Sequence, residues 1–284
     1  MPRYAIAIDA NKCIGCYNCF LTCRDEFAGN DYPGYSAAQP MDGGNWIKVR
    51  EVERGTYPYV KVDHMALTCC HCDDAACIKL DQTEAVYRRP DGIVLIDPEK
   101  AKGNRDIVNT CPYRRIEWNE ELELPQKCTM CAHLLDTGNP EPRCVESCPS
   151  GALVFGDIDD PESSISKLYA SGEFKPLKEE YDMGEKVLYR GIPGKFVAGT
   201  VIYGYIDEAA TNIKVLLTGP DGKQQTVITN GFGDFEFENL PDNTCVTVLI
   251  KASGYKEAIL DAKTSRDIYL GEIKLEKNYQ KGEK

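Results

Sequence analysis

The spacing of its cysteines constrains this chain more than any other feature of the sequence. Twelve of the fourteen cysteines fall into runs between residues 13 and 148. The fullest runs read Cys13-x2-Cys16-x2-Cys19-x3-Cys23 and Cys128-x2-Cys131-x12-Cys144-x3-Cys148, and between them lies Cys69-x2-Cys72-x4-Cys77. Ligands this closely spaced are typical of metal clusters, so we expect the chain to bind a set of iron-sulfur centres.

The first run has the spacing that bacterial ferredoxins use for a 4Fe-4S cluster, in which the last cysteine binds a different cluster. In the second run, Asp81 stands where the fourth cysteine is due. A third run should follow the strand-like segment 92–97, but only its last cysteine, Cys111, remains. Its three lost positions are Ala101, Asn104 and Ile107. The region therefore reads as a fourfold repeat with one damaged unit.

The exchange of last cysteines indicates which ligands belong together. If runs one and four pair, and runs two and three pair, three complete sites result. They are Cys13, Cys16, Cys19 and Cys148 for cluster 1; Cys128, Cys131, Cys144 and Cys23 for cluster 2; and Cys69, Cys72, Cys77 and Cys111 for cluster 3. All four losses then fall on one cluster, the one that would have needed positions 81, 101, 104 and 107. This predicts three 4Fe-4S clusters with these twelve cysteines as iron ligands.

Structural zinc and a disulfide framework are the competing interpretations. Zinc sites usually use separated cysteine pairs, and disulfides suit small secreted domains. The start of the chain reads as a strand that leads into the first ligand, with no charged leader or long apolar run. We therefore favour clusters, and we keep a purely structural role for them as an alternative to electron transfer.

Several residues beside the ligands have an expected role. Cys70 lies between two ligands and is interpreted as a spare thiol, and Cys245 as an ordinary buried cysteine. His71 and His133 flank ligands and are candidates for hydrogen bonds to cluster sulfur or to a partner's cofactor, whereas His64 has no such neighbour. None of the three is expected to be catalytic. At the lost site, we expect polar side chains to occupy the space of a cluster: Lys100, Lys102, Asn104 and Arg105.

Composition limits the partners of the chain. Its 284 residues suffice for about two domains, and its net charge of −12 argues against nucleic acid. No segment reaches the apolar length of a membrane span. We therefore expect a cytoplasmic protein without direct membrane insertion, and export together with a partner stays open.

The second half of the chain has a different pattern. A closing strand is expected at 152–156, then a short helix over 163–170 capped by residues 157–161, then a surface connector to residue 195. Seven β-prone runs follow, separated by turns; they cover residues 196–205, 213–217, 224–229, 234–237, 245–251, 257–260 and 268–275. This predicts an α+β chain with a duplicated ferredoxin-like domain (1–157), a helix and connector (158–195), a small all-β sandwich or barrel (196–276) and a charged tail (277–284).

Two resemblances extend this interpretation. The segment Gly231–Phe237, followed by Leu240-Pro241, resembles the carboxypeptidase regulatory, or transthyretin-like, module. The cysteine runs, with His71 in a CxHC motif and the segment Cys144–Leu153, resemble the iron-sulfur subunit of the dimethyl sulfoxide reductase family of molybdopterin oxidoreductases. That resemblance implies an electron-transfer subunit beside a large catalytic partner, in a heterodimer whose partner holds the molybdenum, the molybdopterin guanine dinucleotide and the active site.

Three clusters with an appended β module resemble the transhydroxylase members of that family, which implies movement of a hydroxyl group between polyhydroxybenzenes. The alternatives are a subunit of another molybdenum reductase and a free-standing polyferredoxin. A fixed partner is favoured because a diffusing carrier needs no second domain.

Overall fold

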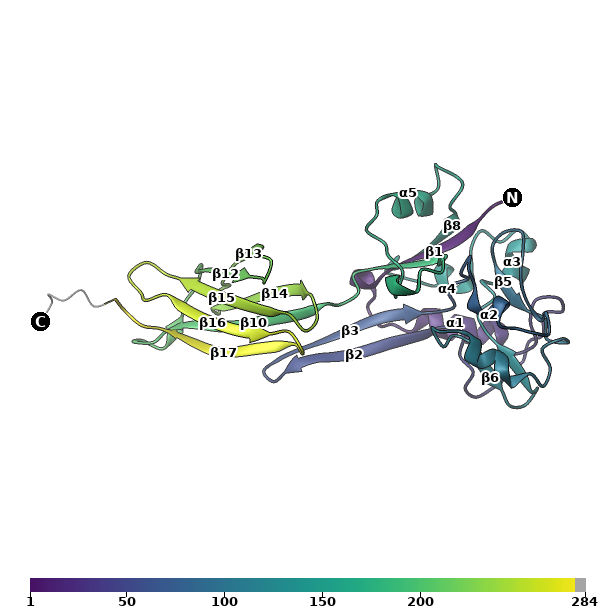
Figure 1. Ribbon diagram of the computed structural model, residues 1–284, viewed down its shortest axis with the longest axis horizontal. Coiled ribbons are helices and arrows are strands. Elements are labelled where there is room, and N and C mark those ends of the chain that lie inside the picture. The colour runs from purple at the N-terminus through teal and green to yellow at the C-terminus, as the bar shows by residue number, and fades with distance from the viewer. Residues whose placement is uncertain (279–284) are drawn as a thin grey trace, which may run out of the picture. The chain divides into compact units, whose positions relative to one another are not determined.

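The computed structural model describes residues 1–278, and these divide into two compact units (Figure 1). Unit 1 contains Met1–Glu51 and Asp63–Ile192, and unit 2 contains Val52–Val62 and the chain from Pro193 onward. Most of the charged tail expected at 277–284 lies outside the described residues. Unit 1 mixes short helices and strands, whereas unit 2 is built of strands.

A three-stranded sheet organises unit 1. Its central strand β1 (Tyr4–Asp9) runs antiparallel to β8 (Leu153–Asp157) and parallel to β9 (Val187–Arg190). Ile6 and Ile8 point into the largest apolar cluster, and Ala5 and Ala7 into a smaller one on the other face. The first strand is therefore paired with two strands from the later part of unit 1, and the expected strands at the start of the chain and near residue 153 are confirmed.

The segment after β8 differs from the expectation in two ways. Helix α5 (Ser164–Ala170) is capped by Ser163, whose Oγ accepts a hydrogen bond from the backbone N–H of Ser166 at 3.1 Å. The cap is therefore not formed by residues 157–161. The expected surface connector is also wrong in part, because it contains β9, and its Phe174 is buried against α5 and β1.

The other helices of unit 1 are short, and most of them contain or flank cysteines of the runs. They are η1 (Ala10–Lys12), α1 (Asn18–Phe27), α2 (Ala76–Lys79), η2 (Arg105–Thr110), α3 (Ala132–Asp136), α4 (Arg143–Glu146) and η3 (Glu179–Tyr181). Among residues 1–278, none of the helices has the length and apolar character that a membrane span requires.

Three β-hairpins complete unit 1. Two are short, β4 (Val86–Arg88) with β5 (Val94–Ile96) and β6 (Glu117–Asn119) with β7 (Leu124–Gln126). The third, β2 (Lys48–Thr56) with β3 (Tyr59–Leu67), was not predicted from the sequence, and its tip is counted with unit 2. The alternation of valine with charged residues over 60–63 was the available signal.

Unit 2 consists of two four-stranded sheets. One contains β10 (Lys195–Tyr203) between β14 (Asp234–Leu240) and β17 (Ile268–Leu275), with β11 (Glu208–Ala209) at the end of β10. The other has the order β13 (Gln224–Ile228), β12 (Lys214–Thr218), β15 (Cys245–Lys251) and β16 (Ala258–Lys263). All seven predicted strands are present, and β11 is additional.

One apolar core joins the two sheets of unit 2. Val197 and Phe235 enter it from the first sheet, and Val215, Val248 and Ile250 from the second. In β15 the expected alternation is confirmed, because Val246, Val248 and Ile250 are buried while the residues between them are not. The C-terminal part is therefore a β-sheet unit with its own core.

Candidate iron-sulfur sites

The first Cys-x2-Cys pair of each of the three cysteine runs closes a backbone turn of the same kind. The residue before the second cysteine has a positive φ in all three runs: 66° at Gly15, 45° at His71 and 53° at Met130. In two of these turns the backbone N–H of that residue points at the first thiol, at 3.5 Å from Cys69 Sγ and 3.3 Å from Cys128 Sγ. Backbone N–H groups aimed at sulfur are a feature of iron-sulfur sites, where they stabilise thiolate and cluster charge.

The turn at Gly15 also involves a histidine from a distant strand. A Cβ atom at Gly15 would lie 2.4 Å from the His64 ring, so only glycine fits there without a shift of the ring. His64 Nε2 lies 3.0 Å from a carboxylate oxygen of Glu51. The expectation that His64 has no ligand run as its neighbour is therefore wrong, because β3 carries it to the first run.

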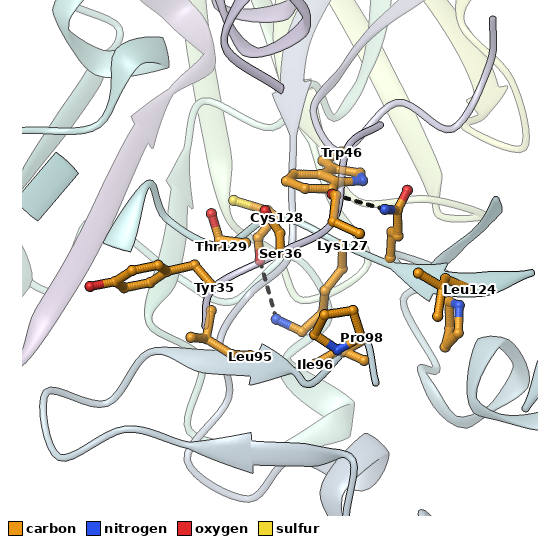
Figure 2. Close-up of a pocket in the computed structure, with 13 residues that line it drawn as sticks. Tyr35, Ser36, Trp46, Leu95, Ile96, Pro98, Leu124, Lys127, Cys128 and Thr129 are labelled. Carbon is orange, nitrogen blue, oxygen red and sulfur yellow. Dashed lines mark hydrogen bonds between the residues drawn. The ribbon is translucent and has the colours of Figure 1, made fainter. Parts of the chain in front are cut away.

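The fourth run begins beside a small cavity that contains the end of a buried lysine (Figure 2). Lys127 is 3% exposed, and its Nζ donates hydrogen bonds to the carbonyl oxygens of Val94 and Cys128. The cavity of about 20 Å³ is also lined by Trp46 and Leu95. A buried ammonium group thus lies directly beside a predicted ligand, a feature that the spacing of the cysteines did not reveal.

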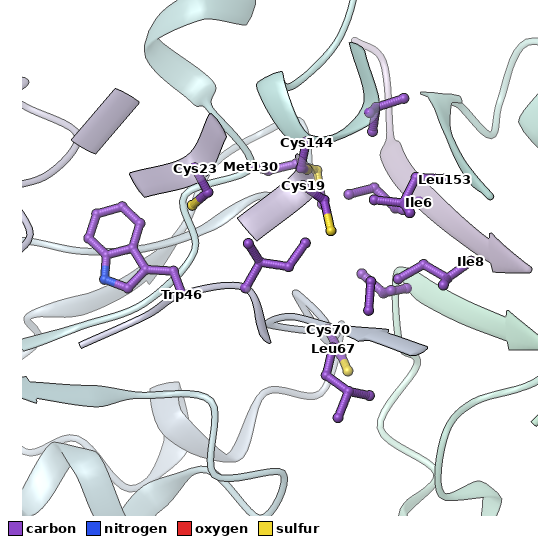
Figure 3. Close-up of a cluster of buried hydrophobic side chains, with 14 of the residues drawn as sticks. Ile6, Ile8, Cys19, Cys23, Trp46, Leu67, Cys70, Met130, Cys144 and Leu153 are labelled. Atoms are coloured by element: carbon purple, nitrogen blue, oxygen red, sulfur yellow. The ribbon is translucent and has the colours of Figure 1, made fainter. Parts of the chain in front are cut away.

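Runs one and four lie together. Helix α1 carries Cys19 and Cys23 and packs against α4, which carries Cys144. The contact includes a hydrogen bond of 2.9 Å between the hydroxyl groups of Thr22 and Ser147. Figure 3 shows Cys19, Cys23 and Cys144 in one buried apolar cluster.

The electrostatic neighbours of these thiols fall into two groups. Burial raises the pKa of Cys19 to about 12, and the nearby thiols of Cys13, Cys148 and Cys16 add to the effect. Burial likewise raises the pKa of Cys23 well above its usual value, with contributions from Cys128 and Cys131. Cys19 thus has neighbours from runs one and four, and Cys23 has Cys128 and Cys131 of run four as neighbours besides Cys19 of its own run.

Runs two and three also lie together. Burial raises the pKa of Cys77 to about 11, and the thiols of Cys69 and Cys111 contribute in the same direction. Burial raises the pKa of Cys72 as well, and again Cys69, Cys111 and Cys77 are among its neighbours. Cys72, Cys77 and Cys111 contact the same small apolar cluster. Cys111 is therefore near the three cysteines of the second run although more than 30 residues separate it from them in the sequence.

Cys148 differs from the other thiols. Burial alone would raise its pKa, but hydrogen bonds from the backbone of Leu153, from the hydroxyl of Ser150 and from further backbone N–H groups lower the pKa below its usual value. A thiol with a lowered pKa is more readily a thiolate, which is the form that binds metal. The loop after Cys148 thus prepares one ligand position electrostatically.

The two remaining cysteines have different surroundings. Cys70 is 3% exposed, and its Sγ lies 4.0 Å from the carbonyl oxygen of Thr68. Cys245 is exposed, so the expectation of a buried cysteine is wrong. The reason is the alternation of β15, which turns Val246 into the core and Cys245 away from it.

At the lost site, apolar side chains fill the space. Ala101 and Ile107 are completely buried in a cluster with Val86, Val94 and Ile116. The expectation that polar side chains occupy this space is wrong, because Lys100, Lys102 and Arg105 are exposed and Asn104 is only partly buried. Burying apolar groups here avoids the cost of desolvating charges without partners.

Asp81 organises a loop at the lost site. Its carboxylate accepts hydrogen bonds from the backbone N–H groups of Thr83, Ala85 and Val86 at 2.7 to 2.9 Å, and from the Thr83 hydroxyl at 2.6 Å. Burial would raise its pKa, but these bonds lower it overall. Asp81, which stands where a cysteine is due, therefore uses its carboxylate to fix the backbone of the loop over residues 83–86.

The backbone of the lost unit retains the turn of a ligand run. Gly103 has φ 75° and occupies the same place between positions 101 and 104 as Gly15 does between Cys13 and Cys16. The sequence carries the same signal, because Ile-Asp-x-x-Lys precedes both Cys13 and Ala101. This shared segment was not recognised in the sequence.

A buried ring nitrogen provides a test of whether a cluster fits the second run. The backbone N–H of Val94 donates to His71 Nδ1 at 3.1 Å, so the proton of the neutral ring is on Nε2. His71 is 1% exposed, and among the described residues Nε2 has no hydrogen-bond partner. A cluster sulfur beside Cys69 and Cys72 is an acceptor of the kind that this donor requires.

The composition of the donors fits the same group. All fourteen cysteines, which lie within the described residues, are free thiols. In residues 1–278, no three His, Cys, Asp or Glu side chains gather closely enough to hold a single metal ion. A 4Fe-4S cluster does not need such a grouping, since each of its four thiolates binds a different iron.

His133 has partners of its own. Its Nε2 lies 3.0 Å from Glu26 Oε1, and its ring stacks on Tyr32 with centroids 3.7 Å apart. Arg143 Nε lies 3.2 Å from the other oxygen of Glu26. This network joins α1 to α3 and α4 around the predicted ligands, so Nε2 of His133 is already occupied by a carboxylate.

Comparisons with known proteins agree with this geometry. The family model for the 4Fe-4S dicluster domain matches residues 60–158. The pyrogallol hydroxytransferase small subunit of Pelobacter acidigallici is 38% identical over 97% of this chain and 100% of that protein. A putative dimethyl sulfoxide reductase iron-sulfur subunit of Halobacterium salinarum is 33% identical over 63% of this chain and 76% of that protein. A tetrathionate reductase subunit of Salmonella typhimurium is 34% identical over 69% of this chain and 75% of that protein.

Among solved structures, the shaft pilin SpaA of Lactobacillus rhamnosus GG covers 34% of this chain and 52% of that chain. Its TM-score is 0.27 and its sequence identity 12%, and this likeness carries no argument about function.

Proposed function

We propose a three-cluster electron relay from the premise that the chain belongs to the iron-sulfur subunits of the dimethyl sulfoxide reductase family of molybdoenzymes. As a member of that family it is an electron-transfer subunit with a 4Fe-4S dicluster domain. The finer assignment is ours: twelve cysteines hold three 4Fe-4S clusters in a duplicated ferredoxin-like unit.

The neighbours of the thiols support this assignment of ligands. Cluster 1 takes Cys13, Cys16, Cys19 and Cys148; cluster 2 takes Cys128, Cys131, Cys144 and Cys23; cluster 3 takes Cys69, Cys72, Cys77 and Cys111. Each group contains one cysteine from the partner run, and the pKa of Cys19, Cys23 and Cys77 each responds to thiols of its own group. The apolar filling around Ala101 and Ile107 supports the absence of a fourth cluster.

We further propose that the chain serves a pyrogallol hydroxytransferase. The observation that carries this proposal is the extent of the similarity. The Pelobacter acidigallici subunit matches 97% of this chain, including unit 2, whereas the reductase subunits named above match 63% and 69%. Unit 2, which we assign to the transthyretin-like modules, is therefore included in the match to the hydroxytransferase subunit, whereas each of the two reductase subunits leaves about a third of this chain unmatched.

In this proposal the catalytic site lies on a large partner subunit. That partner would hold molybdenum and molybdopterin guanine dinucleotide and would convert pyrogallol to phloroglucinol. The hydroxyl transfer is neutral in electrons overall, so a relay of three clusters suffices where a complete fourfold repeat would hold four. This chain contributes the placement and the reduction potentials of its clusters.

The experiment is an assay of the complex purified through a tag on this chain. We expect a large molybdenum-containing partner to co-purify and the complex to convert pyrogallol to phloroglucinol. Dimethyl sulfoxide and tetrathionate reduction with a reduced dye serve as controls. A complex that reduces either control substrate and leaves pyrogallol unchanged would instead make the chain a reductase subunit. A monomer that purifies without molybdenum would make it a free carrier.

A further inference from the structure

Among the buried charges of the described residues, Lys127 and Glu185 have opposite signs and lie beside the proposed clusters. Lys127 is 3% exposed and lies directly before Cys128, and Glu185 is 6% exposed. Charges with so little access to solvent are only weakly screened. In iron-sulfur proteins, local charge and hydrogen bonds determine where the reduction potential falls within a range of roughly a volt.

The contacts of Lys127 hold its ammonium group between two ligand runs. Nζ donates to the carbonyl of Cys128, at 3.2 Å, and to the carbonyl of Val94. The N–H of the same residue, Val94, donates to His71 Nδ1 at 3.1 Å. A continuous hydrogen-bonded chain therefore joins His71, which lies between two ligands of cluster 3, to Cys128, a ligand of cluster 2.

The charge of Lys127 acts on thiols of both groups. Its Nζ contacts the carbonyl oxygen of Cys128, and Val94, whose carbonyl it also contacts, lies in the apolar cluster against which Cys72, Cys77 and Cys111 pack. Cys128 and Cys69 are themselves electrostatic neighbours, which brings the two groups together at this point.

Glu185 acts in the opposite direction on cluster 3. The hydroxyl of Tyr113 donates to its Oε1 at 2.6 Å and holds it in place. The backbone N–H groups of Asp73 and Lys186 donate to the carbonyl oxygens of Gly184 and Cys70, at 2.9 and 2.8 Å, so the segment that carries Glu185 is paired with the chain around Cys72. On the helices that carry Cys23 and Cys144, the partly buried carboxylate is instead that of Glu26, which is paired with Arg143 at 3.2 Å.

We propose that Lys127 is a buried cation that raises the reduction potentials of clusters 2 and 3, and that Glu185 lowers the potential of cluster 3. Each one-electron reduction adds a negative charge to a cluster, which a nearby cation stabilises and a nearby carboxylate destabilises. The pair thus sets the difference in potential between two successive centres. This inference rests on the proposed assignment of the three clusters.

The test is a redox titration of the purified complex followed by electron paramagnetic resonance. Lys127→Met removes the charge and keeps the length of the side chain. We expect reduction of clusters 2 and 3 to become roughly tenfold less favourable, which corresponds to about 59 mV for one electron. Cluster 1 should shift less. Lys102→Met, at an exposed lysine, is the matched control and should leave all three potentials unchanged.

Glu185→Gln provides a test of opposite sign, because glutamine can still accept the hydrogen bond from Tyr113. It should make reduction of cluster 3 easier and leave cluster 2 unchanged. Lys127→Arg keeps the charge and should retain the wild-type potentials. Because the burial of Lys127 leaves a risk that the methionine variant loses iron, Lys127→Gln supplies a second uncharged side chain that can still donate hydrogen bonds to the two carbonyls.

The outcomes separate this inference from the proposed function. A fully loaded complex in which the uncharged variants keep the potentials of clusters 2 and 3 overturns the inference and leaves the proposed function intact. A wild-type complex without three clusters overturns the assignment on which the inference rests. Loss of iron from every variant at Lys127, Lys127→Arg included, would mean that the lysine supports the fold rather than the potentials.

Discussion

The cysteines that we propose as ligands stand out in the sequence, but the charged and polar groups around them do not. Cysteine spacing reflects the local geometry of a cluster-binding turn, so it is visible in one dimension. Glu185 and His64 reach the ligand runs only through the packing of distant segments, and Lys127, although it directly precedes Cys128, is buried by side chains from elsewhere in the chain, among them Trp46 and Leu95. An isolated lysine or glutamate in a sequence is most often a solvated surface residue, and nothing local marks these as buried.

A substitution at Cys111 tests whether a cysteine of one run completes the cluster of another run. Cys111→Ala should lower the iron content from about twelve to about eight per chain, because cluster 3 loses a ligand. Cys70→Ala, at the neighbouring buried thiol, should keep about twelve. Iron and acid-labile sulfide assays give the answer. Retention of all iron by Cys111→Ala, or its loss from Cys70→Ala, would refute the assignment.

An ion pair between Asp136 at the end of helix α3 and Arg89 after β4 can be tested by substitution. Arg89 donates to both oxygens of its carboxylate, at 2.9 and 2.7 Å, and the Tyr35 hydroxyl donates at 2.6 Å. The Arg89 hydrogen bonds, followed by that of Tyr35, lower the pKa of Asp136 to about 2. A lowered pKa stabilises the fold above the usual pKa of about 3.9, and this stabilisation is lost as the pH falls toward 2.

Asp136→Asn should therefore lower the free energy of unfolding by the same amount at pH 5 and pH 8. We expect about 1 kcal/mol, since the carboxylate is partly exposed. Urea denaturation at the two pH values measures it, with Glu162→Gln, in an exposed ion pair, as the control with a smaller effect. A penalty that disappears at pH 5 would contradict the lowered pKa.

At the scale of elements, strands with a regular pattern of side chains were predictable from the sequence. Short strands whose place depends on tertiary packing were not. The seven strands of unit 2 have alternating side chains and clear turns, so their sequence marks them locally. Strand β9 was missed because a strand of four residues between glycine- and proline-containing segments has little periodicity, and its place beside β1 is decided by packing. The apolar packing of Ala101 and Ile107, where a fourth cluster would have been, was not predictable, because it depends on side chains from distant segments.

The loop around Asp81 shows how the lost unit is stabilised without a cluster. Asp81→Ala leaves three backbone N–H groups and a hydroxyl without their acceptor. We expect a loss of roughly 2 kcal/mol in the free energy of unfolding and no change in iron content. Denaturation with an iron assay tests both, and Asp74→Ala, in an exposed pair with Lys79, is the control. A loss of iron from Asp81→Ala would indicate that the carboxylate acts as a ligand.

Within unit 2, the tip of the β2–β3 hairpin is held by a buried ion pair. Arg54 NH1 lies 3.1 Å from Asp267 Oδ1, and the two side chains are 13% and 8% exposed. Asp267 also accepts from the backbone N–H of Phe196 at 3.0 Å. Arg54→Ala leaves a buried carboxylate without its cation, and we expect it to destabilise unit 2 by about 3 kcal/mol.

Hydrogen exchange of the backbone amides in β10 and β17 measures this effect in the intact chain. Protection of these strands should fall in Arg54→Ala. Lys256→Ala, which breaks an exposed pair with Glu276, should change it little. Equal protection in both variants would show that the hairpin tip does not stabilise unit 2.

At the scale of the whole molecule, the chain combines a repeat of cluster-binding turns with a separate β-sheet unit. The repeat accounts for electron transfer, and the similarity over the entire length connects it to the hydroxytransferase subunits. Cysteine spacing indicated the class of cofactor because the pattern of thiolates is specific. The role of unit 2 was predictable only by resemblance, since a β-sheet core has no residues that identify its partner.

The most direct test is native mass spectrometry of this chain, released from the purified complex with its clusters bound. Our account predicts a mass excess of three cubanes, about twelve irons and about twelve sulfides. A mass excess of four cubanes, or of only two, would contradict it.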